Sequence, residues 1–185
     1  MESGIHRVRV KKPKPQNSRV FYRGASEIDG KKIVGIISGL VKGSDNKKTG
    51  AIPQIWILVH GVKPYDAAKN GLDYSICGDC PLRKSKFVKG EVSDKPCYLE
   101  LSKAPRAVWS ANRDKDIVSP SELRTILDGR KVRRGAYGDP LAIPQWVWNE
   151  YFSGIPGTGY THQWETLERL MVEAGTIEPL LEVAA

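Results

Sequence analysis

The chain has 185 residues, of which 40% are hydrophobic and 27% charged, and its formal net charge is +8 at pH 7. This balance is typical of one globular domain whose core needs no disulfide bonds. No apolar run approaches the ~18 residues that a membrane-spanning helix needs, and the first residues lack the apolar segment of a secretory signal. These features exclude a membrane-spanning protein, and we expect an intracellular, cytoplasmic one.

The positive charge is concentrated toward the N-terminus. Residues 1–50 contain twelve lysines and arginines against four acidic residues, a difference of eight that equals the net charge of the whole chain. Such asymmetry indicates a polyanionic partner, DNA or a nucleotide, and the alternative is a solvated basic tail. We predict that residues 1–30 form a basic, partly flexible arm and that residues 31–185 form a single α/β metal-binding domain.

Two strands are predicted in the first third of the chain. Residues 1–19 combine like charges with prolines and predict a flexible arm. Residues 31–40 contain the β-branched run of a strand, and residues 52–61 are nearly all apolar, as in a strand buried on both faces of a parallel sheet. Between them, K-G-S-D-N-K-K-T-G has the glycines and lysines of a phosphate-contacting loop, including Lys47 and Lys48, although the P-loop spacing is absent.

The rest of the chain alternates helices with strands. Residues 62–97 predict a long irregular excursion, which is usual only where something other than a hydrophobic core organises it, and residues 105–114 predict a short strand or helix. The patterns then predict, in order, a helix at 119–129 capped by Ser119, a strand at 131–139, a helix at 144–154, a short strand at 157–164 and a helix at 165–175. This alternation predicts an α/β fold with a mostly parallel sheet, extending at most to a partial or minimal β/α barrel.

The three cysteines are the clearest candidates for metal binding. Cys77 and Cys80 form a C-x-x-C pair, the spacing with which two sulfurs bind one metal, and Cys97 follows a lysine-rich loop. A tetrahedral zinc site needs a fourth ligand, which His60 or His162 can supply, and His60 is included in the predicted set. An iron–sulfur cluster is the alternative cofactor. Without a metal, the cysteines are buried thiols or a redox pair with a bystander.

The ends of the predicted strands supply the candidates for catalysis. Functional groups of parallel α/β sheets gather at the carboxyl ends of the strands, which selects His60, Asp139 and His162. Asp139 lies in G-A-Y-G-D-P, where a carboxylate can act as a general base or a nucleophile, and a turn-forming or helix-capping aspartate is the structural alternative. We predict Asp139 and His162 as the catalytic residues.

The segment 159–164, G-Y-T-H-Q-W, resembles a nucleobase-binding surface in composition. It combines aromatic rings, a hydroxyl, an imidazole and an amide, and proteins hold bases by stacking and hydrogen bonding. As a strand, it would place Tyr160, His162 and Trp164 on one face and the other side chains on the opposite face. A structural histidine beside core aromatics is the alternative. The predicted substrate-binding residues are Tyr137, Tyr160, Thr161, Gln163, Trp164, Lys47 and Lys48.

Five motifs in combination resemble an uncharacterised bacteriophage protein family. They are N-K-K-T-G before a strand, C-G-D-C-P-L, C-Y, R-x-G-x-Y-G-D-P and T-G-Y-T-H-Q-W, and they span roughly residues 42–165. The resemblance implies a phage-encoded protein that acts in the cytoplasm of an infected bacterium. Some relatives have G-D-F where this chain has Gly138, Asp139 and Pro140, so the resemblance leaves the role of Asp139 open.

A more distant likeness is to the guanine transglycosylases and their phage DNA-modifying relatives. Those proteins are β/α barrels with a catalytic aspartate and a zinc ion held by three cysteines and a histidine. The ligand classes here are similar, but the cysteine spacing differs, and the chain is shorter than the ~250 residues of a full barrel. The likeness implies base exchange or base modification.

We therefore predict a metal-binding enzyme that acts on DNA or a nucleotide, with a base-modifying transferase as its most concrete form and zinc or an iron–sulfur cluster as its cofactor. The basic arm would add salt-sensitive affinity for phosphates. The alternative is a non-catalytic phage DNA-binding protein, or an inhibitor of host defence, that contains a structural metal. The reaction, the metal and the oligomeric state do not follow from the sequence.

Overall fold

The structure is a computed structural model, which describes residues 15–43, 50–83, 87–88, 91–92, 97–173 and 175. Lys47, Lys48 and residues 1–14 of the predicted basic arm lie outside the described residues. The described helices and strands, in chain order, are β1 (Ser18–Ala25), β2 (Lys32–Ser38), β3 (Gln54–Val59), α1 (Pro64–Lys69), α2 (Tyr74–Cys77), β4 (Phe87–Val88), β5 (Glu91–Val92), α3 (Ala104–Asn112), α4 (Pro120–Ile126), β6 (Val132–Tyr137), the short 3₁₀ helix η1 (Pro140–Ala142), α5 (Gln145–Phe152), β7 (Gly157–Thr158) and α6 (Trp164–Glu173).

The main sheet is mixed, with its five strands in the order β1-β2-β3-β6-β7. β2 runs antiparallel to both β1 and β3, whereas β6 runs parallel to both β3 and β7. The structure is α/β, but the predictions of a mostly parallel sheet and of a minimal barrel are wrong. The described residues of the connections from β1 to β2 and from β2 to β3 contain no helix, and both connections reverse the chain, while a parallel neighbour needs a longer crossover. The sheet remains open because β1 and β7 do not pair.

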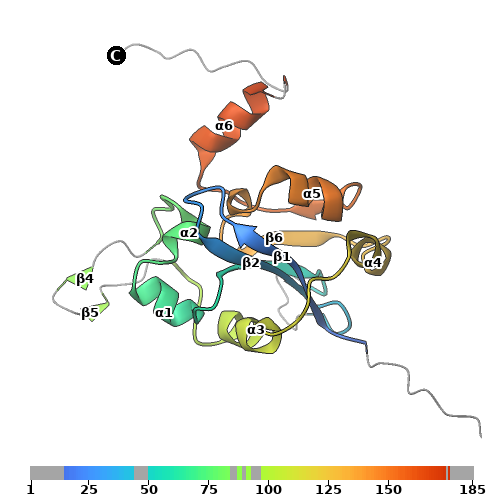
Figure 1. The fold of residues 1–185 in the computed structure, drawn as a ribbon, viewed down its shortest axis with the longest axis horizontal. Helices are drawn as coiled ribbons and strands as arrows, with labels where there is room; N and C mark the ends of the chain where they lie inside the picture. The colour runs from blue at the N-terminus through green and yellow to red at the C-terminus, as the bar shows by residue number, and fades with distance from the viewer. Residues whose placement is uncertain are drawn as a thin grey trace, which may run out of the picture.

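Helices cover both faces of this sheet, which explains why β2 and β3 are largely apolar and buried. α1 and α3 lie on one face, and α5 lies on the other (Figure 1). On the α5 side, the Phe21 ring packs edge-on against Phe152 with ring centroids 5.0 Å apart, and a Cβ on Gly35 would lie 2.6 Å from the Phe21 ring. β3 is buried along nearly its whole length, so the prediction of a strand buried on both faces is confirmed.

β1 lies within residues 1–30, which are predicted as a basic, partly flexible arm. Val20, Phe21 and Tyr22 of this strand belong to the core, so residues 18–25 are part of the sheet. Its two arginines are half-buried. Arg19 forms an ion pair with Glu122 at 3.6 Å, and Arg23 donates to main-chain carbonyls at the end of α3. Composition alone does not distinguish a short strand that lies between basic residues from a flexible segment.

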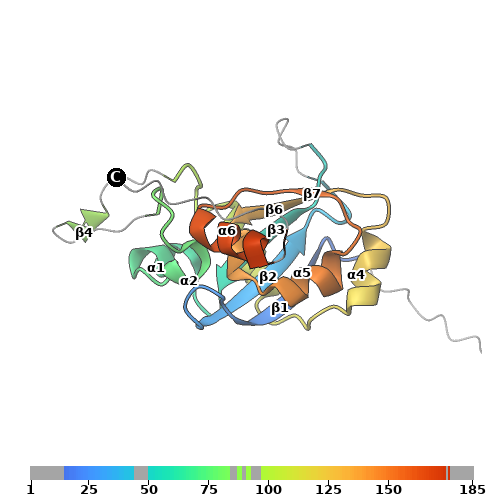
Figure 2. The ribbon, with the colours of Figure 1, turned by 90° about the horizontal axis from the view of Figure 1, so that it is seen from above.

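The stretch predicted as irregular, residues 62–97, contains the helices α1 and α2, which lie at one end of the sheet, whereas α4 lies at the other (Figures 1 and 2). α2 is held to the turn between β1 and β2. The Ser26 hydroxyl donates to the Ser75 carbonyl at 2.6 Å, and the Ser75 hydroxyl donates to Asp29 at 2.8 Å. These two bonds set the position of Cys77, the last residue of α2.

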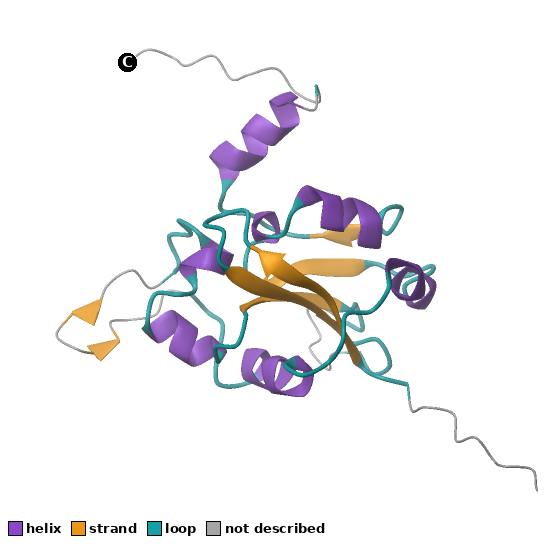
Figure 3. Cartoon of the chain, viewed as in Figure 1, coloured by secondary structure: helices purple, strands orange, loops and turns teal. Residues whose placement is uncertain are grey.

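The predicted strand at 157–164 is mostly a loop. Only Gly157 and Thr158 pair with β6, and α6 begins at Trp164 and projects away from the sheet (Figure 3). The expected alternation of side chains is therefore wrong for residues 159–163. The predicted helices nearby are confirmed, and the Ser119 hydroxyl caps α4 by accepting from the Glu122 amide at 3.2 Å. No helix in the described ranges is long and apolar enough to cross a membrane.

Candidate functional site

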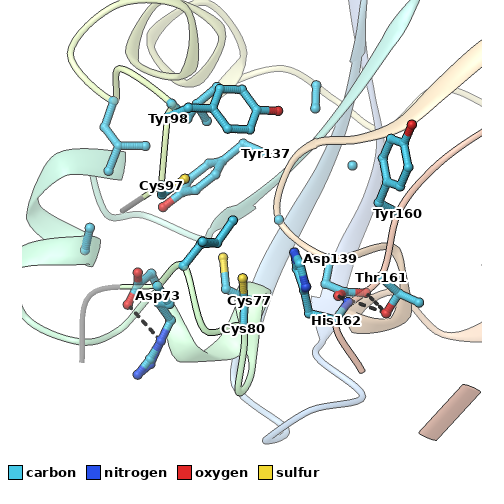
Figure 4. A pocket seen from close by; sticks show the side chains of 18 of the residues that line it. Asp73, Cys77, Cys80, Cys97, Tyr98, Tyr137, Asp139, Tyr160, Thr161 and His162 are labelled. Carbon is cyan, nitrogen blue, oxygen red and sulfur yellow. Dashed lines mark hydrogen bonds and ion pairs between the residues drawn. The ribbon is translucent and has the colours of Figure 1, made fainter. Parts of the chain in front are cut away.

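One cavity of about 360 Å³ brings together three motifs that are far apart in the sequence (Figure 4). Its walls come from α2 and the C-x-x-C turn, from residues 97–101, from the end of β6 and from the loop at residues 159–162. The cavity thus lies at the carboxyl end of a parallel strand, where binding sites of α/β proteins gather. All three cysteines line it, together with Tyr137, Asp139, Tyr160, Thr161 and His162.

The C-x-x-C turn follows directly from the end of α2. Gly78 ends the helix with a φ of 52°, and the Cys80 amide donates back to the Cys77 carbonyl at 3.2 Å. A Cβ on Gly78 would lie 2.5 Å from the Gln163 side chain, whose Nε2 donates to the Cys77 carbonyl at 3.0 Å. Glycine is therefore required at position 78 both by its backbone conformation and by its contact with Gln163.

The three thiols influence one another across the cavity. Burial raises the pKa of Cys77, and Asp73, Cys80 and Cys97 raise it further. Burial also raises the pKa of Cys80, although backbone N–H groups of the turn lower it in part. In Figure 4 the sulfurs of Cys77 and Cys80 lie near each other, and the Cys97 sulfur lies toward Tyr137. Without a positive charge between them, Cys77 and Cys80 remain neutral thiols at pH 7.

As placed in the described ranges, no three His, Cys, Asp or Glu side chains lie where they could hold one metal ion. The predicted ligand set is also divided between two places. His162 lines the cavity with the cysteines, whereas His60 is exposed and lines a separate cavity of about 340 Å³ with Arg23 and Trp109. His60 follows β3, and His162 follows the short strand β7. The strand-end rule selected both histidines, but it could not show that they line different cavities.

Asp139 is buried, and its carboxylate accepts several hydrogen bonds within the protein. Oδ1 accepts from the Leu141 amide at 3.0 Å, Oδ2 accepts from the His162 amide at 2.8 Å, and the Thr161 hydroxyl lies within 2.9 Å of both oxygens. The Asp139 amide also donates to the Ile76 carbonyl at 2.6 Å. Asp139 thus caps η1 and connects the end of β6, α2 and the loop carrying His162, which is the structural alternative named for it. Its predicted catalytic role stays a prediction.

The predicted substrate-binding residues of the 159–164 segment separate in space. Thr161 and Tyr160 line the cavity, and Tyr160 is 83% exposed at its edge. Gln163 lies behind the C-x-x-C turn and supports it, while Trp164 begins α6, is 65% exposed and is not among the cavity-lining residues. The structure therefore divides the segment into cavity contacts, a structural amide and an exposed ring.

Two polar residues of the cavity, Arg83 and Tyr98, were not among the site residues predicted from the sequence. Arg83 forms an ion pair with the buried Asp73, its Nε lying 3.7 Å from Oδ1, and its guanidinium lies 5.0 Å from the centre of the Tyr74 ring. Tyr98 is 77% exposed at the edge of the cavity and accepts from Arg133 at 3.2 Å. A signal was available in both cases, because Arg83 follows the C-x-x-C turn by three residues and Tyr98 is adjacent to Cys97.

Comparisons of the chain with protein-family models, with curated proteins and with solved structures found no match.

Proposed function

We propose that this chain is a metal-binding protein that acts on DNA or a nucleotide and holds a nucleobase in the cavity described here. The observation that carries the proposal is the convergence of three thiols and one imidazole on the same cavity, from three separate segments of the chain. Aromatic and cationic groups at its edge support the choice of ligand.

Cys77, Cys80, Cys97 and His162 would hold the metal. Three thiolates and an imidazole suit zinc, and three thiolates suit an iron–sulfur cluster with one open iron. Metal would supply the positive charge that lets the buried thiols ionise, and binding would draw the four side chains closer together, as expected where metal binding is coupled to local folding. A zinc ion or an iron–sulfur cluster would supply Lewis-acid or redox chemistry beside the bound base.

The walls of the cavity support a nucleobase as the ligand. Tyr98 and Tyr160 lie at its edge with most of each ring exposed, and exposed aromatic rings are the groups on which unpaired bases stack. Arg133 also lines the cavity beside Tyr98, where a phosphate or a base edge would meet its positive charge. A volume of about 360 Å³ lies within the range of small-molecule sites.

A non-catalytic nucleic-acid-binding protein with a structural metal is the second candidate. The observation that favours it is the carboxylate of Asp139, which already accepts hydrogen bonds from the protein at both oxygens. The two candidates separate when the metal-loaded protein is incubated with single-stranded DNA whose bases are then analysed by mass spectrometry. An altered or exchanged base supports the enzyme, whereas binding without any change of mass supports the second candidate.

The metal is tested on protein purified without oxygen, by metal and sulfide analysis with an absorption spectrum. One zinc per chain without visible absorption, or iron and sulfide with a visible chromophore, supports the proposal, and neither metal near unit occupancy overturns it. His162→Gln is expected to weaken metal retention, and Cys77→Ser to abolish it. His60→Gln is the matched control, because His60 lines the separate cavity, and loss of metal in this variant would contradict the assignment of His162.

A further inference from the structure

A second cavity, of about 340 Å³, lies beside α3 and shares no lining residue with the cavity that contains the cysteines. Part of its lining is apolar and comes from core side chains, Val34 and Ile36 of β2 and Trp109 of α3. The other part carries nitrogen groups, from Arg23, His60 and Arg113. Apolar walls with a few placed polar groups are typical of a site for a small molecule.

The register of the sheet places Arg23 and His60 on the same wall of this cavity. Arg23 lies opposite Val34 in the β1–β2 pair, and Val34 lies opposite Leu58 in the β2–β3 pair. Side chains that lie opposite each other share a face of the sheet, with Cβ atoms about 5 Å apart. His60 comes two residues after Leu58, and its amide still donates to the Lys32 carbonyl at 3.1 Å. Arg23 and His60 therefore flank Val34 on the face that α3 covers.

The end of α3 brings a second guanidinium to the same cavity. Arg23 Nη2 donates to the carbonyls of Asn112 and Arg113 at 3.2 and 3.1 Å, which holds its guanidinium against the end of the helix. The Arg113 guanidinium lies 5.7 Å from the centre of the Trp109 ring, and its Nε lies 3.0 Å from Oδ2 of Asp114. Within the described ranges, no acceptor occupies Nε or Nη1 of Arg23, or either Nη of Arg113.

These donors can be reached from outside the protein. The Arg113 side chain is 57% exposed, His60 is exposed, and Arg23 is half-buried. Among the described lining residues, Asp114 alone is acidic, and it stands against two guanidinium groups. Its side chain is 84% exposed, and ion pairs in such a position contribute little. An anionic group that enters the cavity therefore meets an excess of positive charge and N–H donors suited to it.

We propose that this cavity is a binding site for a small aromatic anion. The aromatic body would lie against Val34, Ile36 and Trp109, and its carboxylate or phosphate would accept from Arg23 and Arg113. The site goes beyond the proposed function, since it needs neither a metal nor a base in the cavity that contains the cysteines. An aromatic carboxylate and a nucleoside monophosphate share the required chemistry.

Binding is tested with the full-length protein and two probes of the same ring system, naphthoate and its uncharged analogue naphthamide. Titration calorimetry is expected to show naphthoate binding about tenfold to hundredfold more tightly, the range for hydrogen bonds to a charged group. In proton–nitrogen NMR spectra naphthoate should shift the amide of Gly61, which lines this cavity. Equal binding of the two probes, no binding, or a shift confined to Gly138 of the other cavity would overturn the proposal.

Three charge-removing variants locate the anion. Arg113→Gln should remove most of the preference for naphthoate with little change in the temperature of unfolding, because its ion pair with Asp114 is exposed. Arg23→Gln should remove the preference and also lower that temperature, since it releases two carbonyls of α3. Arg106→Gln is the matched control, because Arg106 is an exposed residue of α3 outside the cavity lining.

The proposal fails if Arg113→Gln keeps the preference, since Arg23 would then serve only to cap α3. It also fails if Arg106→Gln loses as much preference as Arg113→Gln, because net charge and not this cavity would then attract the anion.

Adenosine monophosphate and inorganic phosphate distinguish the sources of the anion. Adenosine monophosphate that binds more tightly than naphthoate, and is weakened by Arg113→Gln, assigns the site to a nucleotide, whereas the reverse order assigns it to an aromatic carboxylate. Inorganic phosphate has no aromatic body to bury and should bind more weakly than both. Phosphate binding as tight as that of the aromatic probes would overturn the role of Val34, Ile36 and Trp109.

Discussion

Asp139 shows how a residue with the chemistry of a catalyst can serve as a connector between segments. Its two oxygens accept from the Leu141 amide, the His162 amide and the Thr161 hydroxyl, and its own amide donates to Ile76. Every one of these donors belongs to a segment that forms a wall of the cavity or supports one. At the scale of single residues, the cavity therefore depends on Asp139 for its shape.

Asp139→Asn is expected to destabilise the protein by about 1–3 kcal/mol, because one oxygen becomes an NH₂ group that faces another donor. The free energy of unfolding, measured in urea, checks this. Asp128→Asn is the matched control, since Asp128 lies outside the cavity-lining residues and should leave stability nearly unchanged. Loss of activity in Asp139→Asn at unchanged stability would instead indicate the predicted catalytic role.

Gly78→Ala is expected to disturb both the C-x-x-C turn and the loop that contacts it. The added Cβ would lie 2.5 Å from the Gln163 side chain in a backbone with a φ of 52°, so metal retention and stability should fall together. Gly30→Ala is the comparison, because Gly30 also has a positive φ of 73° but nothing within 4 Å of an added Cβ. Equal metal loss in both variants would show that backbone strain alone, without the Gln163 contact, explains the effect.

At the scale of elements, the position of α2 decides where the C-x-x-C turn lies. α2 is only one turn long, so its own backbone bonds hold it weakly. Ser75, fully buried, connects it to the turn between β1 and β2 through Ser26 and Asp29. The first hairpin of the sheet thus positions a cysteine that lies some fifty residues further along the chain.

Ser75→Ala is expected to lower stability in a pH-dependent way. Burial alone would raise the pKa of Asp29, but hydrogen bonds from Ser75 and Lys31 and the Lys31 charge lower it below its ordinary value of 3.8. A lowered pKa in the folded state means that the stabilisation is present above pH ~4 and disappears as the pH falls through the folded pKa. The destabilisation caused by Ser75→Ala should therefore be larger at pH 6 than near pH 3.

Urea unfolding of both proteins at the two pH values measures this difference. Ser102→Ala is the matched control, because the Ser102 hydroxyl donates to an exposed carboxylate, Glu100, at 2.8 Å. Its effect on stability should be small at both pH values, since exposed polar contacts contribute little. A destabilisation by Ser75→Ala that is the same at pH 6 and pH 3 would contradict the role of Asp29.

At the scale of the whole molecule, the charge and the cavity address different parts of a nucleic acid. Under the proposed function, the eight positive charges in excess within residues 1–50 would contact the phosphate backbone, whereas the cavity would hold one base. β1 begins at Ser18, and the Asn17 side chain accepts from the Val41 and Lys42 amides at 2.8 Å, so Asn17 is joined to the residues that follow β2.

Deletion of residues 1–14 is expected to weaken binding to single-stranded DNA and to reduce its salt dependence. The deletion removes Arg7, Arg9, Lys11, Lys12 and Lys14 but keeps Asn17 and β1. The slope of log affinity against log salt should become shallower by about 0.7 for each phosphate that the shortened chain no longer neutralises. Binding titrations at several salt concentrations measure it, and an unchanged slope would show that the arm does not bind phosphates.

The sequence by itself determined the features of local structure that depend on residues close together in the chain. The buried strand at β3, the Ser119 cap of α4, the helix at α5 and the placing of Cys77 and Cys80 on one turn all follow from patterns within a few residues. Periodicity, capping and turn geometry are local properties, so they can be read before the chain is folded.

Only the tertiary structure decided which segments meet and in which direction they run. Strand direction depends on the connections, so β2 became antiparallel to β3 while β6 became parallel to it. His162 joined the cysteines and His60 did not. Asp139 acquired donors from residues 22 and 23 positions away. Hydrogen-bond partners and burial arise from contacts between distant segments, which no local pattern in the sequence encodes.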